Sequence, residues 1–195
     1  MKAKGIFYIS TFIMCGLLVL FSSPATAAEV YKVDPVHSAI TFRIKHLGVS
    51  YVRGRFNNAS GTITFDDKMP GKSSVKISVK VDDIDTFNAK RDKHLKSHEF
   101  FDAEKYPLIS FHSETFQKIG EDTYEVGGQL SFHGVTRPLT VQVEHIGSAK
   151  DPWGGYRAGF ETSFKVKRSD FGMTHMQGGV GDEVRLTVNI EGIRK

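Results

Sequence analysis

The sequence predicts an all-β protein: a closed, eight-stranded antiparallel barrel with one short helix inserted near residues 89–98. Three observations carry this prediction. Apolar and polar residues alternate through most of residues 28–195, which is the period of a strand with one buried face. Most loops between the alternating segments have the length of hairpin turns. An up-and-down order of such strands leaves no free sheet edge when the sheet closes on itself.

The first 27 residues are expected to be a secretory signal peptide that lies outside the fold. Two lysines precede a long apolar run, and Ala25-Thr26-Ala27 forms a small-x-small cleavage site. An uncleaved membrane anchor is the alternative, but the run is short for a full span. The one cysteine, Cys15, lies inside this run, so the mature domain, residues 28–195, is expected to fold without disulfides.

The charge balance gives no electrostatic argument for a nucleic-acid partner. The full chain has 26 lysine and arginine residues against 22 aspartate and glutamate residues, a net charge of +4. The signal peptide contains two of the lysines, which leaves 24 basic and 22 acidic side chains in the mature domain. A balance this close to neutral does not single out an acidic partner.

Turn residues separate the predicted strands. Asp34-Pro35 follows the first strand, an Asn/Ser/Gly cluster occupies residues 57–61, and glycines mark turns at Gly120 and Gly134. Residues 168–181 are rich in glycine and are expected to be irregular. The predicted strands are residues 30–33, 40–46, 52–56, 63–65, 75–81, 109–111, 124–132, 139–145, 156–166 and 184–190.

Residues 89–98 form the one convincing helix of the mature chain. The side-chain oxygen of Asn88 can cap the first turn, and the residues that follow are mostly good helix formers. Pro107 excludes helix further along. We expect this helix to close one end of the barrel, with Leu95, Phe100 and Phe101 facing inward.

The barrel interior is the first candidate for a binding site. An eight-stranded barrel is just wide enough to be filled by side chains or to hold one slender ligand. Fifteen phenylalanines favour a long apolar slot, in which Gly54 and Gly128 would leave room. Packing of the same residues into an ordinary core is the alternative that composition leaves open. The candidate lining residues are Phe42, Ile44, Phe56, Phe65, Ile77, Val79, Leu95, Phe100, Phe111, Leu130, Phe132, Phe160, Phe164, Phe171 and Met173.

No sequence motif identifies a catalytic centre. The nucleophile elbow, the phosphate-binding loop and the dinucleotide fingerprint are all absent. Asp34 with His37, or Asp92 with His94, could perform acid–base chemistry, but nothing in their spacing selects them. The protein is therefore expected not to be an enzyme.

A metal site is also not expected. His94 and His98 would share one face of the predicted helix, but the metalloprotease pattern H-E-x-x-H is absent. A site would also need a third ligand, for which His37, His112 and His133 are candidates that the sequence does not place. Arg91 is expected to pair with Asp92. The alternative for Arg91 is an anionic head group at the mouth of the barrel, because its planar fork suits phosphate.

Five segments in order along the mature chain carry a family pattern. The first consists of Asp34, His37-Ser38, Phe42, His46-Leu47-Gly48-Val49-Ser50, Gly54 and Phe56, and the second of Arg91-Asp92-Lys93-His94-Leu95-Lys96-Ser97 with Phe100, Phe101, Asp102 and Tyr106-Pro107. The third is Gly128-Gln129-Leu130-Ser131-Phe132-His133-Gly134-Val135-Thr136-Arg137-Pro138. The fourth is Asp151-Pro152-Trp153-Gly154 with Arg157-Ala158-Gly159-Phe160, and the fifth is Lys167-Arg168-Ser169-Asp170-Phe171-Gly172. With these segments in register, the chain resembles the YceI-like family of lipocalin-like, polyisoprenoid-binding periplasmic proteins.

The resemblance implies a lipocalin-like barrel over residues 28–195, with an elongated apolar tunnel and a helix near one end. It implies periplasmic binding, carriage or storage of a long-chain isoprenoid lipid, a quinone or a similar amphiphile, and no cofactor besides that ligand. Arg91, Arg53 and Tyr51 are the candidates for head-group contact. A transient contact with a membrane or a respiratory protein, as a monomer or a homodimer, is a further expectation. The alternatives are an enzyme that acts on a lipid-like substrate through His and Asp, and an interaction module without a ligand.

Overall fold

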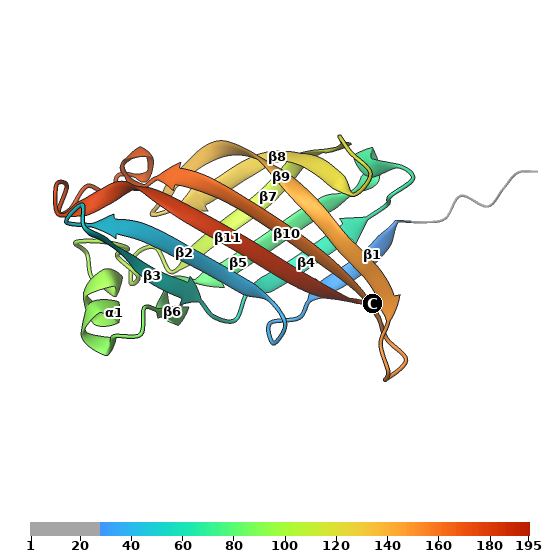
Figure 1. The fold of residues 1–195 in the computed structure, drawn as a ribbon, viewed down its shortest axis with the longest axis horizontal. Coiled ribbons are helices and arrows are strands. Elements are labelled where there is room, and N and C mark those ends of the chain that lie inside the picture. Colours follow the sequence, from blue (N-terminus) through green and yellow to red (C-terminus); the bar gives the residue numbers. More distant parts are fainter. Residues whose placement is uncertain (1–27) are drawn as a thin grey trace, which may run out of the picture.

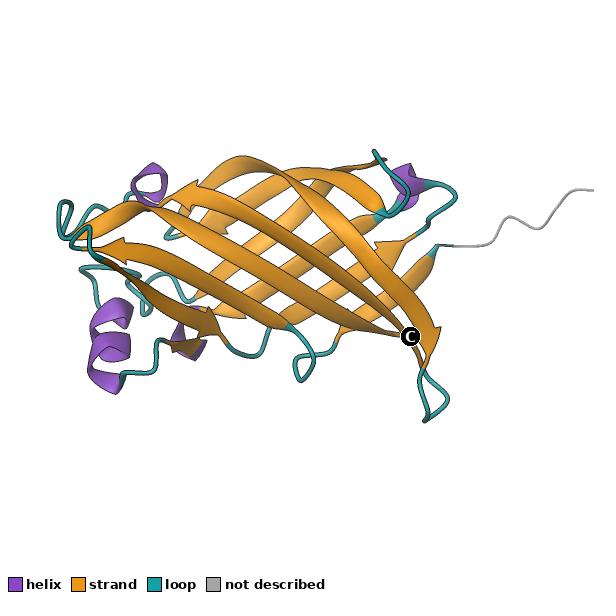
Figure 2. Ribbon diagram, viewed as in Figure 1, coloured by secondary structure: helices purple, strands orange, loops and turns teal. Residues whose placement is uncertain are grey.

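The computed structural model describes residues 28–195, so the predicted signal peptide lies outside the described residues. Eleven strands in this range form one antiparallel sheet that wraps into an elongated barrel (Figures 1 and 2). None of the helices from residue 28 onward has the length and apolar character needed to cross a membrane. The strands are β1 (Glu29–Val33), β2 (Ala39–His46), β3 (Ser50–Phe56), β4 (Ser60–Phe65), β5 (Ser74–Lys80), β6 (Ile84–Asp85), β7 (Leu108–Lys118), β8 (Thr123–Phe132), β9 (Val135–Lys150), β10 (Tyr156–Lys167) and β11 (Val180–Arg194).

Eight of the strands close into a ring, which confirms the predicted barrel. In the order β1, β4, β5, β7, β8, β9, β10 and β11, each strand is hydrogen-bonded to the next, and β11 returns to β1. The ring closes where Tyr31 of β1 lies opposite Ile63 of β4 on one side and Arg194 of β11 on the other. Closure pairs both edges of these strands, which removes the unpaired edges of an open sheet.

The remaining three strands, β2, β3 and β6, extend the sheet from β11. The last residues of β11 pair with β1, whereas the residues before them pair with β2. β3 pairs with β2, and the two-residue β6 pairs with the end of β3 at Phe56. This extension lies at one end of the barrel, where it borders the helix α1 (Ala89–Lys96) (Figure 1).

Left-handed backbone conformations form the tight turns at this end of the barrel. His133 (φ 51°) and Gly134 (φ 73°) make the two-residue turn between β8 and β9. Leu47 (φ 50°) and Gly48 (φ 73°) begin the turn between β2 and β3. Consecutive positive φ angles give a turn whose twist matches that of the flanking strands.

Gly54 and Gly128 allow close packing and do not line the hollow interior, contrary to the prediction that they leave room for a ligand. A Cβ atom at Gly54 would lie 2.5 Å from a ring carbon of Phe42. A Cβ atom at Gly128 would lie 2.2 Å from the backbone oxygen of His112 on the neighbouring strand β7. The missing Cβ atom thus makes room for the Phe42 ring at Gly54 and for the backbone of β7 at Gly128.

Helix α1 begins as the sequence predicts but ends two residues earlier. The Asn88 side-chain oxygen accepts a hydrogen bond from the backbone N–H of Arg91 at 3.0 Å. The helix stops at Lys96 because the backbone N–H and the hydroxyl of Ser97 both bond to the carbonyl of His94. His98 therefore lies beyond the helix, and the predicted helical face shared by His94 and His98 does not form.

Buried apolar side chains form two clusters. The larger one includes Tyr31 and Phe65 and extends through the ring strands. The smaller one lies near α1 and consists of Phe100, Phe132, Phe171 and Met173. Leu95 of α1 is partly buried and packs against both clusters, so the helix contributes an apolar side chain to this end of the barrel.

Candidate functional site

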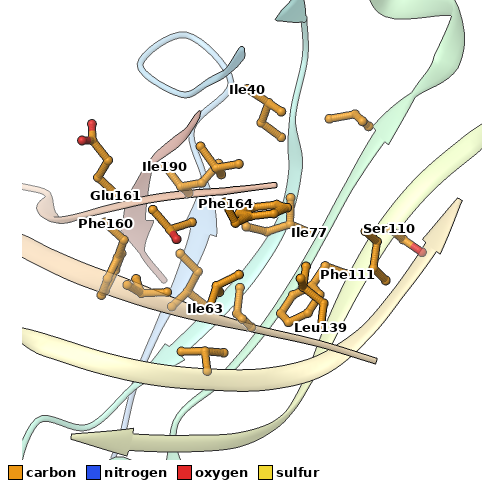
Figure 3. A pocket seen from close by; sticks show the side chains of 18 of the residues that line it. Ile40, Ile63, Ile77, Ser110, Phe111, Leu139, Phe160, Glu161, Phe164 and Ile190 are labelled. Atoms are coloured by element: carbon orange, nitrogen blue, oxygen red, sulfur yellow. The ribbon is translucent and has the colours of Figure 1, made fainter. Parts of the chain in front are cut away.

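The barrel interior is hollow and contains two lobes. The first, here called the strand lobe, holds about 990 Å³ of empty space, its opening included. Twenty-one residues line it, and only Ser110, Glu161 and Thr162 among them are polar. Figure 3 shows the labelled apolar side chains converging on a shared space, with the Glu161 carboxylate turned away. The wall of this lobe matches a hydrocarbon ligand.

The second lobe, here called the helix lobe, lies between α1, the sheet extension and the segment that follows β10. It holds about 1250 Å³ of empty space, its opening included. Its wall is also mainly apolar, but five of its twenty lining residues are basic or histidine: Lys45, His46, Arg91, His94 and Arg168. No carboxylate is among the lining residues. The polar part of this wall therefore favours an electron-rich or anionic group.

The two lobes meet at a waist formed by Phe56, Ile109 and Leu130, which line both of them. The Phe56 ring lies 5.6 Å from that of Phe42 and 5.9 Å from that of Phe101, measured between centroids. These are ordinary distances for aromatic pairs in a packed wall. A ligand longer than one lobe would have to pass this waist.

Thirteen of the fifteen predicted lining residues do line the hollow. The strand lobe contains five of them, the helix lobe six, and the waist two. Their contact with a ligand stays a prediction. In the strand lobe they are Ile77, Val79, Phe111, Phe160 and Phe164; in the helix lobe Phe42, Ile44, Leu95, Phe100, Phe132 and Met173; and at the waist Phe56 and Leu130.

Phe65 and Phe171 face other side chains and line neither lobe. The Phe65 ring lies 4.7 Å from the His145 ring and 5.4 Å from the Tyr124 ring, inside an aromatic cluster of the ring strands. The Phe171 ring lies 5.0 Å from that of Phe132, behind the wall of the helix lobe. Strand parity predicts the inward direction of a side chain, but it does not tell packed positions from open ones.

Of the three head-group candidates, only Arg91 reaches the hollow. Its Nε and Nη2 atoms donate to the hydroxyl and the carbonyl oxygen of Thr86 at 2.8 and 2.5 Å. Asp92 accepts from the Thr86 backbone N–H at 2.9 Å, so Arg91 and Asp92 meet through Thr86 rather than as a direct pair. Arg53 and Tyr51 are exposed, because the alternation of β3 turns Val52 and Phe56 inward instead.

Arg168 is the most deeply buried of the basic lining residues that sequence reasoning missed; Lys45, His46 and His94 are the others. Arg168 is 2% exposed, and its guanidinium donates to the carbonyl oxygens of Gly181, Met173 and Val180 at 2.9, 3.0 and 3.1 Å. Burial lowers its pKa below the ordinary arginine value. Its bonds anchor the irregular segment after β10. The only sequence signal for it was its membership in the segment Lys167-Arg168-Ser169.

Of the two acid–base pairs that the sequence offers, only Asp34 with His37 is formed, and it lies outside both lobes. His37 Nδ1 is 2.8 Å from Asp34 Oδ2, and neither residue lines the hollow. The second pair does not form: Asp92 bonds to Thr86, whereas His94 Nε2 lies 2.6 Å from Glu99 Oε2. The described residues therefore bring no His–Asp pair to the cavity wall.

Sequence comparisons find relatives over almost the whole described chain. A model of the YceI-like domain matches residues 31–192. A UPF0312 protein of Pseudomonas aeruginosa (strain LESB58) is 44% identical over 178 residues, which cover 90% of this chain and 93% of that protein. Protein YceI of Salmonella arizonae is 40% identical over 179 residues, which cover 91% and 93% of the two chains.

Solved structures share the fold. The YCEI protein of Campylobacter jejuni matches with a TM-score of 0.69 and 31% identity over 77% of this chain and 90% of its own. BcnA of Burkholderia cenocepacia matches with a TM-score of 0.75 and 23% identity over 82% and 98%. A polyisoprenoid binding domain from Saccharophagus degradans matches with a TM-score of 0.66 and 15% identity over 87% and 100%. At these lower identities, the last two matches show the fold alone.

Proposed function

The chain belongs to the YceI-like family, and on that premise we propose that it binds a long-chain isoprenoid lipid or quinone inside the barrel. The observation that carries the proposal is the two-lobed hollow, which is almost wholly apolar and has its cationic groups in the helix lobe alone. The domain from Saccharophagus degradans, which has the same fold, is described as polyisoprenoid-binding. That description supports the ligand class proposed for this chain.

Burial of the hydrocarbon chain supplies the driving force. Each methylene moved from water into an apolar site contributes about 0.8 kcal/mol, so several isoprene units outweigh the cost of ordering a flexible lipid. The hydrocarbon chain of the ligand occupies the strand lobe and crosses the waist at Leu130. No covalent step is needed, and the His37–Asp34 pair takes no part because it lies outside the lobes.

The polar end of the ligand occupies the helix lobe. Lys45, His46 and Arg91 can meet a carbonyl, hydroxyl or phosphate oxygen there, and no lining carboxylate opposes it. Arg91 is held by Thr86, so its guanidinium is positioned before the ligand arrives. This arrangement orients the ligand with its head group toward α1.

Carriage in the periplasm is part of the proposal. The signal peptide expected at residues 1–27 would deliver the domain there. Leu47, Val49 and Met176 are exposed beside the helix lobe, in two turns joined by the hydrogen bond from Leu47 N to Gly179 O at 2.8 Å. These apolar side chains give the lobe a surface on which to meet a membrane during lipid exchange.

Mass spectrometry of an organic extract from natively purified protein tests the proposal. We expect a co-purified prenyl lipid, and after delipidation we expect saturable uptake of an added polyprenyl lipid or quinone. Absence of both would contradict the proposal. Turnover of the added lipid, lost in His94→Ala, would instead favour the alternative of an enzyme that acts on a lipid-like substrate.

A further inference from the structure

Two histidines and a glutamate come together at the rim of the helix lobe. Glu99 follows α1, and its Oε2 atom lies 2.6 Å from His94 Nε2. Its other oxygen, Oε1, lies 3.8 Å from Nε2 of His175, which comes from the segment between β10 and β11. One ligand atom from each of the three residues lies within 4.8 Å of the other two. The carboxylate therefore lies between two imidazoles that are 81 positions apart in the sequence.

We propose that His94, Glu99 and His175 form a binding site for a divalent transition-metal ion, with Zn²⁺ as the reference ion. Two imidazole nitrogens and a carboxylate oxygen are a donor set that Zn²⁺, Co²⁺ and Ni²⁺ accept. Ligand atoms about 2.1 Å from a tetrahedral ion lie roughly 3.4 Å from each other. The observed separations bracket this value, so small side-chain rotations are enough to enclose an ion.

The packing around the cluster holds both imidazoles in place. The ring of Phe100, which is 5% exposed, lies 5.0 Å from the ring of His94 and 5.0 Å from that of His175, both in edge contacts. A shared aromatic support restricts both rings to one region. Such preorganisation lowers the ordering cost of binding an ion.

The backbone on both sides of His175 is also anchored. Arg168 donates to the carbonyl oxygen of Met173, two residues before His175. The carbonyl oxygen of Met176, the next residue, accepts from the N–H groups of Gly179 and Val180 at 3.1 and 2.9 Å. His175 is therefore held in a segment that is anchored on both sides, although residues 172–179 form no helix or strand.

Three protein ligands leave at least one coordination position open. Open positions distinguish sites that exchange water or another ligand from closed structural sites. His94 lines the helix lobe, so an ion bound to it stands at the border of the hollow. Metal binding at this site is a property separate from the proposed lipid binding, and the ion can bind whether or not a lipid is present.

A second cluster of similar composition, Asp34, His37 and Glu191, does not carry the same inference. Arg157 Nη1 already bonds to Asp34 Oδ2 at 2.8 Å and to Glu191 Oε1. A guanidinium therefore takes the place that a metal ion would need. The cluster of His94, Glu99 and His175 has no such cation among the described residues. Its only ion pairs there join Glu99 to His94 and to His175.

The test uses the full mature chain without a histidine tag, treated with a chelator and then dialysed. Calorimetric titration with Zn²⁺ is expected to give one site per chain, and Co²⁺ is expected to produce visible absorption bands of a four- or five-coordinate ion. His175→Ala and Glu99→Gln are expected to weaken Zn²⁺ binding at least tenfold and to abolish the Co²⁺ bands. All three side chains are partly exposed, so the substitutions are expected to leave the protein folded. Thermal unfolding of each variant checks this.

His98→Ala and His37→Ala are the matched controls. His98 is an exposed histidine next to Glu99, and His37 belongs to the cluster occupied by Arg157. Both variants are expected to keep the affinity and the spectrum of the unchanged protein. Absence of stoichiometric binding, or an equal loss of affinity in His98→Ala and His175→Ala, would overturn the proposal. Lipid uptake measured on the same variants separates this result from the proposed lipid binding.

Discussion

The Arg157 Nη1 atom in β10 lies 2.8 Å from the Oδ2 atom of Asp34, 123 positions earlier in the chain. The same guanidinium bonds through Nε to Asp151 at 2.9 Å and through Nη1 to Glu191 of β11. Asp34 follows β1 directly, so these ion pairs fasten β1 to β10 and β11 near the point of ring closure. The relationship joins segments that no local sequence pattern connects.

Asp34→Asn is expected to destabilise the barrel in a pH-dependent manner. The hydrogen bond from His37, together with that from Arg157, lowers the pKa of the Asp34 carboxyl to about 2 from an ordinary 3.8. The carboxylate therefore contributes stability that is complete above pH 3.8 and is lost as the pH falls toward 2. At pH 7 we expect a loss of about 2 kcal/mol, because charged hydrogen bonds to a buried group are removed.

Urea unfolding of both proteins from pH 7 to pH 2 measures this effect. The difference in unfolding free energy between Asp34→Asn and the unchanged protein should shrink between pH 4 and pH 2. Asp122→Asn, at an exposed position, should change stability little at any pH. A pH-independent difference for Asp34→Asn would contradict the assignment.

Leu130→Trp is expected to block the waist between the two lobes. The larger side chain extends toward empty space, so we expect unfolding stability to change by no more than about 1 kcal/mol. Uptake of long polyprenyl chains should fall at least tenfold, whereas short prenyl alcohols that fit one lobe should still bind. Leu108→Trp, at a position 52% exposed, is the control and should leave uptake unchanged. Equal uptake of long chains by both variants would place the ligand elsewhere.

Leu95→Asp is expected to destabilise the end of the barrel that carries α1. Leu95 lines the helix lobe and packs against both apolar clusters, so an aspartate there loses apolar contact and places a charge against an apolar wall. We expect a loss of about 2 kcal/mol of unfolding free energy. Lys93→Asp, at an exposed position on the same helix, is the control. Unchanged thermal stability of Leu95→Asp would refute the inward position of this side chain.

Arg168→Lys is expected to loosen the segment between β10 and β11. Lysine keeps the positive charge but cannot reproduce the three directed bonds to the carbonyls of Met173, Val180 and Gly181. We expect a loss of about 2 kcal/mol and faster amide exchange in residues 173–181. Arg185→Lys, at an exposed position in β11, should change neither quantity. Equal exchange in the two variants would show that Arg168 does not anchor the segment.

The predicted helix shows where local reasoning is reliable and where it fails. Its start at Asn88 follows from a side chain that caps its own neighbours, which is a local event. Its end is decided by Ser97, whose hydroxyl also returns to the His94 carbonyl. Ending the helix at Lys96 removes the assumed His94–His98 face and leaves His94 to meet Glu99 instead.

Strand parity placed most of the candidate lining residues on the walls of the two lobes, but it did not separate packed positions from open ones. Parity assigns Phe65 an inward direction, but a neighbouring aromatic cluster fills the space around it. Parity turns Arg53 and Tyr51 of β3 outward, so neither of these two head-group candidates borders the hollow. Whether an inward position borders empty space depends on residues from other strands.

The sequence by itself determined the all-β class, the positions of most strands and the apolar character of the interior. These properties follow from a two-residue period and from turn residues, which act over a few neighbours. The tertiary structure decided the closure of Tyr31 against Arg194, the division of the hollow into two lobes, and the meeting of His94 with His175. Each of these depends on contacts between residues far apart in the chain, and no local period encodes such contacts.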